Sequence, residues 1–299
     1  MKEIKLSKKE ADFIKRINES RKIISQFLVI EKSIKRTKNN KPYLDLVLQD
    51  KTGQIIGRMF NKNVNNVFDK IEEGKVYNIV GKVQEFPVNS KKYNIILERI
   101  ILAKTYDEEE FIRQIENQDS HINYLINTIS EIENKELKLV LATMFDNDEF
   151  FEKFITAPAA KRHHHNYKGG LLVHTNEVIE ICKTIATIYE DIDSDLLITG
   201  AILHDIGKTE TYDYRTEKIE MTDEGSMIEH IFIGGHLVKE CMCSLNISEK
   251  TQTDLLHLIL SHHGDVELGW GSSVSPKTPE AIALHQADDM SAKITKSLE

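Results

Sequence analysis

A histidine and an aspartate stand side by side at positions 204 and 205, at the end of the apolar run 196–202. The run has the composition of a buried helix, and an imidazole beside a carboxylate at its end suits a divalent metal ion. The carboxylate of Asp205 can also bridge two such ions. Taken alone, residues 203–208 (LHDIGK) fit equally well a capped helix end with a hydrogen-bonded His204.

Three other histidine positions and one aspartate share a feature with this pair, because they lie on or at the ends of separate predicted helices, with two adjacent histidines at the end of one helix. They are His174, His230, His262, His263 and Asp288. Two adjacent histidines share one ion most easily at a fraying helix end. His262 and His263 lie at such an end, because Gly264 directly after them is placed to be the C-terminal cap of their helix. A helical bundle can bring ligands from separate helices to one interior point. The ordered set therefore predicts a metal site.

The elements that must position these residues form two regions of different periodicity. From about residue 122 onward the apolar residues recur at helical spacing, which predicts an all-α domain. The first third instead predicts strands over 23–34, 43–48, 55–60, 76–83 and 93–102, with a short helix over 63–71 between the third and the fourth. This order is typical of an all-β OB-fold barrel. A short leading helix is expected over residues 1–20.

Two loops of the predicted barrel, 35–41 and 86–93, are basic and have aromatic residues beside them. OB-folds bind single strands with such loops, using cations for phosphates and aromatic rings for bases. A peptide-binding or structural role is the alternative, and Phe60 fits the core as well as it fits the surface. The residues assigned to nucleic-acid contact here are Arg36, Lys38, Lys41, Tyr43, Arg58, Phe86, Lys91, Lys92 and Tyr93.

Charge is distributed unevenly along the 299 residues. Residues 1–105 hold 23 Lys and Arg against 12 Asp and Glu, a net charge of +11, and the remainder carries −20. A basic module joined to an acidic one indicates a part that binds polyanions, with a solvated lysine-rich surface as the alternative. We expect a leading helix at 1–20, the OB-fold at 21–105, an acidic linker at 106–120 and the helical domain at 121–299.

The composition is that of a globular protein of the cytoplasm. Hydrophobic residues make up 40% and charged residues 29% of the chain, and no apolar run is long enough for a membrane span. The charged N-terminus does not resemble a signal peptide. The three cysteines are too few for a disulfide framework, which favours a reducing compartment. Neither a membrane partner nor secretion is expected.

Several stretches together resemble a known family: 158–175 (PAAKRHHHNYKGGLLVHT), 202–208 (ILHDIGK), 261–264 (SHHG) and 276–281 (PKTPEA). The helical part resembles the HD superfamily of metal-dependent phosphohydrolases in its two-metal form. With the barrel included, from about residue 23 to the C-terminus, the chain is similar to the YhaM-type 3′→5′ exoribonuclease family. Ser291 departs from this resemblance, since a second acidic residue is expected there.

The resemblance implies how the ligands are shared between two divalent transition-metal ions. One ion would be held by His174, His204, Asp205 and Asp288, and the other by His230, His262 and His263, with Asp205 bridging. Imidazole and carboxylate ligands without thiolate suit Mn, with Fe, Co or Ni as alternatives.

Three further residues of these stretches are candidates for substrate contact. Lys208 would bind a phosphate, unless it is an ordinary lysine at a helix C-terminus. His164 would contact the substrate or protonate the leaving oxygen, unless the cluster 163–165 only packs the rim of the cleft. Arg162 is assigned to nucleic-acid contact.

The sequence thus predicts a cytoplasmic 3′→5′ exonuclease that hydrolyses single-stranded RNA, or single-stranded DNA, to nucleoside 5′-monophosphates. An HD phosphohydrolase of free or cyclic nucleotides is one alternative. A non-catalytic RNA-binding protein with structural metals is the other. Whether the chain forms a homo-oligomer is left open.

Overall fold

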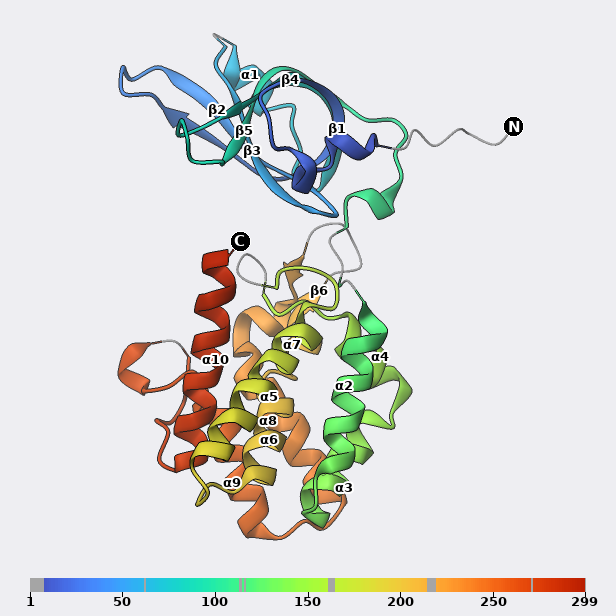
Figure 1. The fold of residues 1–299 in the computed structure, drawn as a ribbon, viewed down its shortest axis with the longest axis vertical. Helices are drawn as coiled ribbons and strands as arrows, with labels where there is room; N and C mark the ends of the chain where they lie inside the picture. Colours follow the sequence, from blue (N-terminus) through green and yellow to red (C-terminus); the bar gives the residue numbers. More distant parts are fainter. Residues whose placement is uncertain are drawn as a thin grey trace, which may run out of the picture. The chain divides into compact units, whose positions relative to one another are not determined.

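The computed structural model describes residues 8–61, 63–112, 115, 117–160, 165–213, 219–269 and 271–298. Contacts divide the chain into two compact units, with the division in sequence at residues 113–114. The first unit is a barrel and the second is helical (Figure 1). This confirms the predicted fold class, while the finer domain boundaries at 21, 106 and 121 stay predictions. In the described part of the chain, no helix is long and apolar enough to cross a membrane.

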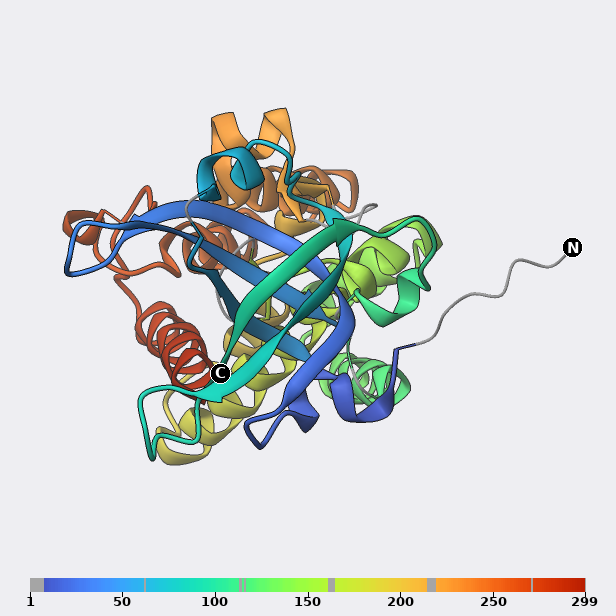
Figure 2. The ribbon, with the colours of Figure 1, turned by 90° about the horizontal axis from the view of Figure 1, so that it is seen from above.

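The barrel consists of five strands closed in the order β1-β2-β3-β5-β4 (Figure 2). Neighbouring strands are antiparallel except β3 and β5, whose parallel pairing closes the barrel. The short helix α1 (Val64–Phe68) lies between β3 and β4 in sequence, as predicted for an OB-fold. The strands are β1 (Lys22–Arg36), β2 (Pro42–Asp50), β3 (Gly53–Met59), β4 (Lys75–Glu85) and β5 (Tyr93–Leu102).

The barrel interior follows from the alternation of apolar residues along the strands. Leu44, Leu46 and Leu48 of β2 are buried together with Phe27 of β1 and further apolar residues of β4 and β5. Successive side chains of a strand point to opposite faces, so one face of β2 fills the core. Asp45, on the other face, is nevertheless buried, because Arg58 and Lys35 both contact its carboxylate.

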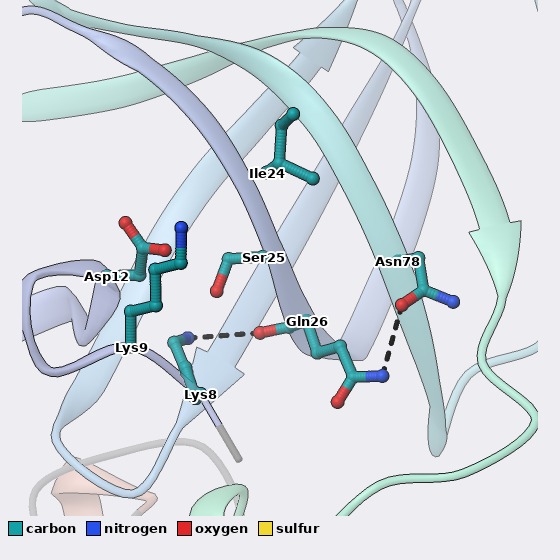
Figure 3. Close-up of a pocket in the computed structure, with 7 residues that line it drawn as sticks. All are labelled: Lys8, Lys9, Asp12, Ile24, Ser25, Gln26 and Asn78. Carbon is teal, nitrogen blue, oxygen red and sulfur yellow. Dashed lines mark hydrogen bonds between the residues drawn. The ribbon is translucent and has the colours of Figure 1, made fainter. Parts of the chain in front are cut away.

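The predicted leading helix is wrong for residues 8–20, which form two short 3-10 turns, Glu10–Asp12 and Ile14–Arg16. The segment is held to the barrel by a buried ion pair between Lys8 Nζ and Asp50 Oδ2, 2.6 Å apart. Lys8 Nζ also donates to the carbonyl oxygen of Gln26, beside a small pocket on β1 and β4 (Figure 3). Isolated helices of this length are marginal in water, so tertiary anchors decide the conformation.

The helical unit is organised around α5 (Gly170–Ile188), which packs against α6 (Ser194–Leu203) and α10 (Pro279–Leu298). Every residue from Leu196 to Leu203 is buried, as expected for the apolar run before His204. The remaining elements are η3 (Glu108–Glu110), α2 (Gln118–Glu131), α3 (Lys135–Phe145), α4 (Asp148–Thr156), α7 (Lys208–Thr211), β6 (Tyr212–Asp213), β7 (Glu220–Met221), α8 (Asp223–Ser244), α9 (Glu249–Ser261) and η4 (Val266–Leu268).

Candidate metal centre

The helical unit brings the predicted ligands together from separate helices. His174 lies in the first turns of α5, His204 directly follows α6, His230 lies within α8 and His262 directly follows α9. These four side chains are buried. Asp288 reaches the same place from α10, and Asp205 follows His204. A bundle interior is where helices can present such groups to one point.

One group of side chains surrounds Asp205 Oδ2. This oxygen lies 3.5 Å from His174 Nε2 and 3.3 Å from His204 Nε2. Asp288 Oδ1 lies 3.0 Å from His174 Nε2 and 3.9 Å from His204 Nε2. Atoms bound at about 2.0–2.2 Å to one ion lie roughly 3.0–3.5 Å apart. Three of these four distances fall in that range, so the group can share one ion.

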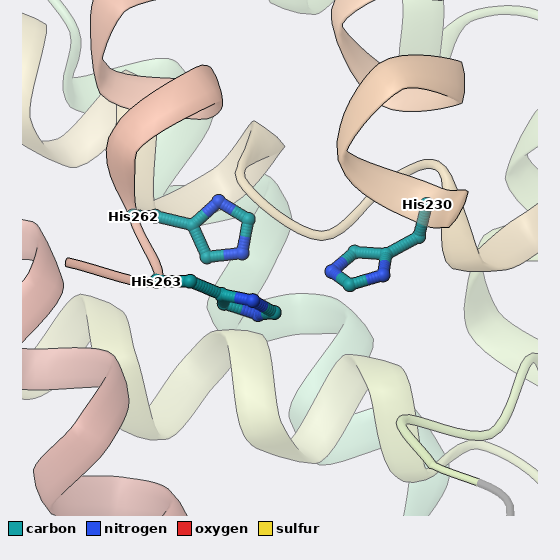
Figure 4. A group of neighbouring side chains, drawn as sticks. All are labelled: His230, His262 and His263. Atoms are coloured by element: carbon teal, nitrogen blue, oxygen red, sulfur yellow. The ribbon is translucent and has the colours of Figure 1, made fainter. Parts of the chain in front are cut away.

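A second group surrounds the other oxygen of the same carboxylate. Asp205 Oδ1 lies 3.4 Å from His230 Nε2 and 3.6 Å from His262 Nε2. The rings of His230, His262 and His263 converge, and each offers a nitrogen within 4.8 Å of the others (Figure 4). The two oxygens of Asp205 therefore face two different histidine groups, which is the geometry that a bridging carboxylate requires.

Buried polar atoms at this point indicate that a cation fits there. Among the described residues, the buried side-chain atoms without a hydrogen-bond partner include Asp205 Oδ1, His230 Nε2 and His262 Nε2. An unpaired buried polar atom is costly, and three of them facing one space are best accounted for by a shared ligand. Imidazole nitrogens and carboxylate oxygens suit a divalent transition metal.

The rings are oriented by hydrogen bonds to their other nitrogens. His204 Nδ1 lies 2.9 Å from the carbonyl oxygen of Ala201, and His262 Nδ1 lies 2.7 Å from that of Ile259. A carbonyl only accepts, so both Nδ1 atoms carry the proton, and in the neutral rings that bind a metal both Nε2 atoms present a lone pair toward Asp205.

Charge at the centre is set by burial and by the ligands themselves. Burial lowers the pKa of His174 and that of His230, which favours the neutral imidazole that a metal needs. Burial alone would also lower the pKa of His204, but the charge of Asp205 outweighs it and raises that pKa. The pKa of Asp205 lies well below its ordinary value, because Lys208 and His204 outweigh the cost of burial.

Lys208 is buried, and its Nζ donates to Asp205 Oδ2 at 2.5 Å. Lys208 lies three residues after Asp205, at the start of α7, so it belongs to the centre itself. Its contact with a phosphate of the substrate stays a prediction. Arg162 and His164 lie outside the described residues, and their predicted roles also stay predictions.

A kink in α8 and a glycine together place His230. Glu229 has φ 62° and ψ 155° inside α8, so the helix breaks directly before the histidine. A side chain on Gly207 would lie 2.0 Å from the carbonyl oxygen of His230. The glycine of the 203–208 stretch is therefore required by the close approach of α8.

Sequence reasoning did not single out Glu177 or His165 as individual site residues. Glu177 lies three residues after His174 on α5, and this spacing, which places two side chains on one helix face, was the available signal. His165 is buried, and its Nε2 lies 3.1 Å from Glu177 Oε2. The contact between His165 and Glu177 depends on how the segment before α5 folds back onto that helix, which no local pattern in the sequence shows.

On the barrel, aromatic and cationic side chains gather near the predicted loops. Phe60 is 54% exposed and stacks on Tyr43, with ring centroids 5.1 Å apart, so it belongs to the surface rather than the core. Phe86 is 55% exposed, and the Arg58 guanidinium lies 5.9 Å from the centre of its ring. Exposed rings of this kind are platforms on which bases can stack.

The other residues predicted to contact nucleic acid differ in whether a hydrogen bond within the barrel unit already holds their side chain. The Tyr93 hydroxyl donates to the carbonyl oxygen of Asn18, which holds that ring in place. Arg36 donates to the carbonyl oxygen of Asn40 within its own loop. The side chains of the other cations are exposed on the two loops, namely Lys38, Lys41, Lys91 and Lys92. Contact of these residues with nucleic acid stays a prediction.

Comparison with known protein families matches both units. Residues 171–293 match the model of the HD domain, and residues 29–103 match that of an OB-fold nucleic acid binding domain. The fold and the site thus define a metal-dependent phosphohydrolase of the HD class that carries an OB-fold.

Comparison with individual proteins defines the family. The chain is 31% identical to the 3′-5′ exoribonuclease YhaM of Listeria welshimeri over 278 residues, which cover 91% of this chain and 85% of that protein. It is 29% identical to YhaM of Bacillus subtilis over 274 residues, with the same two coverages. The chain belongs to the YhaM family of 3′-5′ exoribonucleases.

Two solved structures match parts of the chain. The mitochondrial single-stranded DNA-binding protein Rim1 from S. cerevisiae covers 29% of this chain and 96% of its own, at 14% identity and a TM-score of 0.24. The HD domain of the phosphodiesterase PgpH from L. monocytogenes covers 50% of this chain and 74% of its own, at 18% identity and a TM-score of 0.32.

Proposed function

We propose that this protein is a metal-dependent 3′→5′ exoribonuclease that hydrolyses single-stranded RNA to nucleoside 5′-monophosphates, with single-stranded DNA as a second substrate. One observation carries the proposal. In a chain of the YhaM family, the two oxygens of one buried carboxylate, Asp205, face two histidine groups, and in the second group the buried Nε2 atoms of His230 and His262 have no hydrogen-bond partner.

The ligand set assigns a role to each group. His174, His204 and Asp288 would hold one ion, and the three histidines in Figure 4 would hold the other, with Asp205 between them. Mn²⁺ is the proposed ion, with Fe, Co or Ni as alternatives, because the ligand set combines carboxylate with imidazole and contains no thiolate. Bound ions of this kind supply Lewis acidity toward a phosphodiester and its attacking water. Lys208 forms an ion pair with Asp205 and would also bind a phosphate oxygen of the substrate.

The barrel would hold the strand whose 3′ end is cleaved. Exposed rings at Phe60 and Phe86 would stack on bases, and the loop lysines would contact phosphates. Neither contact reads sequence, so the enzyme would accept single strands of any sequence. The cytoplasm is the proposed location, in agreement with three cysteines that are free of disulfides.

The test uses the full chain with RNA labelled at its 5′ end, treated with EDTA and then given Mn²⁺, Mg²⁺, Co²⁺ or Ni²⁺ separately. We expect shortening from the 3′ end, abolished by EDTA and restored best by Mn²⁺. His204→Ala should abolish it, while His236→Ala, which changes an exposed histidine, should not. Full activity of His204→Ala would contradict the catalytic role of the centre.

The rival activity is separated by the same assay. A phosphohydrolase of free or cyclic nucleotides would cleave those compounds faster than an oligonucleotide and would show no dependence on chain length. We expect the opposite order. Parallel reactions with DNA of the same sequence decide whether the second substrate is accepted.

A further inference from the structure

A chain of side chains lies behind His174, on the side away from Asp205 and Asp288. His174 Nδ1 lies 3.1 Å from Ser291 Oγ on α10. Ser291 Oγ lies 2.7 Å from Glu177 Oε2, which returns the chain to α5 one helical turn after His174. Ser291 is 3% exposed. Two helices are thus linked through one serine hydroxyl.

The direction of these hydrogen bonds follows from the acceptor at the end of the chain. An ionised carboxylate only accepts, so Ser291 donates its proton to Glu177. Burial opposes ionisation of Glu177, but hydrogen bonds from His165 and Ser291 outweigh it and keep the pKa of the carboxyl below its ordinary value. The lone pairs of Ser291 Oγ then face His174, whose Nδ1 must carry the proton. Nε2 is left with its lone pair toward the carboxylates.

His174 differs in this respect from two other predicted ligands. His204 and His262 donate from Nδ1 to backbone carbonyls, which cannot reverse their role. A serine hydroxyl can donate or accept, so it does not fix the tautomer of His174 by itself. Glu177 removes this ambiguity.

Glu177 is itself held in place. His165 Nε2 lies 3.1 Å from Glu177 Oε2, and Thr295 Oγ1 lies 3.3 Å from it. His165 has φ 55° and is 3% exposed, and its Nδ1 lies 3.1 Å from the Tyr167 hydroxyl. His165, His174 and Glu177 each offer an atom within 4.8 Å of the others, which is close enough for a cation. The Glu177 oxygen already accepts from several donors, however, so hydrogen bonds account for it.

We propose that Glu177 is a positioning residue that acts through Ser291 to fix the tautomer and orientation of His174. The proposal rests on the metal centre put forward above and adds to it an outer partner on a neighbouring helix. Such partners of metal-bound histidines raise metal affinity by orienting the ring.

The experiment measures Mn²⁺ binding to the metal-free full chain by calorimetry and by the electron paramagnetic resonance signal of free Mn²⁺. We expect Ser291→Ala and Glu177→Ala each to weaken one binding step by roughly 10- to 100-fold. The double variant should bind no more weakly than Ser291→Ala, because both substitutions break the same chain. Thr295→Val is the matched control, since it removes a bond to Glu177 outside the chain, and it should bind as the parent does.

Losses that multiply in the double variant, or unchanged affinity of both single variants, would overturn the proposal. Glu177 is partly exposed, so Glu177→Ala keeps the test valid if Ser291→Ala does not fold. His174→Ala separates this result from a failure of the metal centre. If His174→Ala binds Mn²⁺ as the parent does, the assignment of the metal centre is wrong. If His174→Ala loses Mn²⁺ binding while the Ser291 and Glu177 variants keep it, only the proposed hydrogen-bond link from Glu177 to His174 is rejected.

Discussion

The carboxylate of Asp205 is the point at which single residues decide the site. Its Oδ2 faces His174 and His204, and its Oδ1 faces His230 and His262. Asp205 is thus the carboxylate that contacts both histidine groups. Asp288 supplies a second carboxylate to only one of the groups, where it lies 3.0 Å from His174 Nε2.

This asymmetry leads to a prediction for Asp288→Asn. The amide keeps the size of the side chain but removes the charge beside His174, so one ion should be lost. Losing an outer partner already costs roughly 10- to 100-fold, and loss of a direct ligand should lower activity by more than about a hundredfold. Asp289→Asn is the control, because Asp289 pairs with Lys293 on the surface. Equal activity of the two variants in the RNA assay would contradict the assignment.

A second prediction at this scale concerns the exposed ring of Phe86. Stacking of one base on an aromatic side chain contributes about 1–3 kcal/mol. Phe86→Ala should therefore weaken binding of single-stranded RNA by roughly 5- to 150-fold in EDTA, where no cleavage occurs. Val88→Ala changes an exposed apolar residue of the same loop that has no ring, and it should bind normally. Fluorescence anisotropy of a labelled oligonucleotide measures both, and equal affinity would rule out stacking at Phe86.

At the scale of elements, α8 is strained where it presents His230. Glu229 has φ 62° and ψ 155°, a conformation that is adopted almost only by glycine and costs about 1–3 kcal/mol for other residues. Glycine relieves this cost, so Glu229→Gly should raise the free energy of unfolding by about 1 kcal/mol. The same change at Glu224, in the regular first turn of α8, should lower it by a similar amount. Thermal unfolding followed by circular dichroism compares the two, and a loss of stability in both would show that Glu229 is not strained.

The elements also show what a single sequence can predict. Strand β5 was predicted at its observed bounds, and the order of strands and helix was confirmed, because alternation and turns are local signals. The leading helix was wrong, since Lys8 pairs with Asp50, 42 residues away, and such a partner leaves no local trace. For the same reason the link from Glu177 through Ser291 to His174 could not be predicted, because it depends on how α10 lies against α5.

At the scale of the whole molecule, the two ends of the sequence carry opposite charge, +11 for residues 1–105, which include the barrel, and −20 for the remainder. The positive charge for RNA therefore comes from the barrel, while in the helical unit it would come from the bound ions. Binding and hydrolysis should then respond differently to solution conditions. EDTA should stop hydrolysis and leave RNA binding intact.

Salt dependence tests this division of roles. Binding that releases counterions from single strands weakens with a slope of about −0.7 per contacted phosphate in a plot of log affinity against log salt. Four contacts would thus lower the affinity about fifty-fold between 50 and 200 mM salt. Replacing four loop lysines by glutamine, in a variant with Lys38, Lys41, Lys91 and Lys92 changed together, should flatten the slope. Replacing four lysines of the helical unit, Lys135, Lys138, Lys239 and Lys250, should leave it unchanged. If the slope flattens in the variant of the helical unit and stays unchanged in the loop variant, the RNA binds to the helical unit.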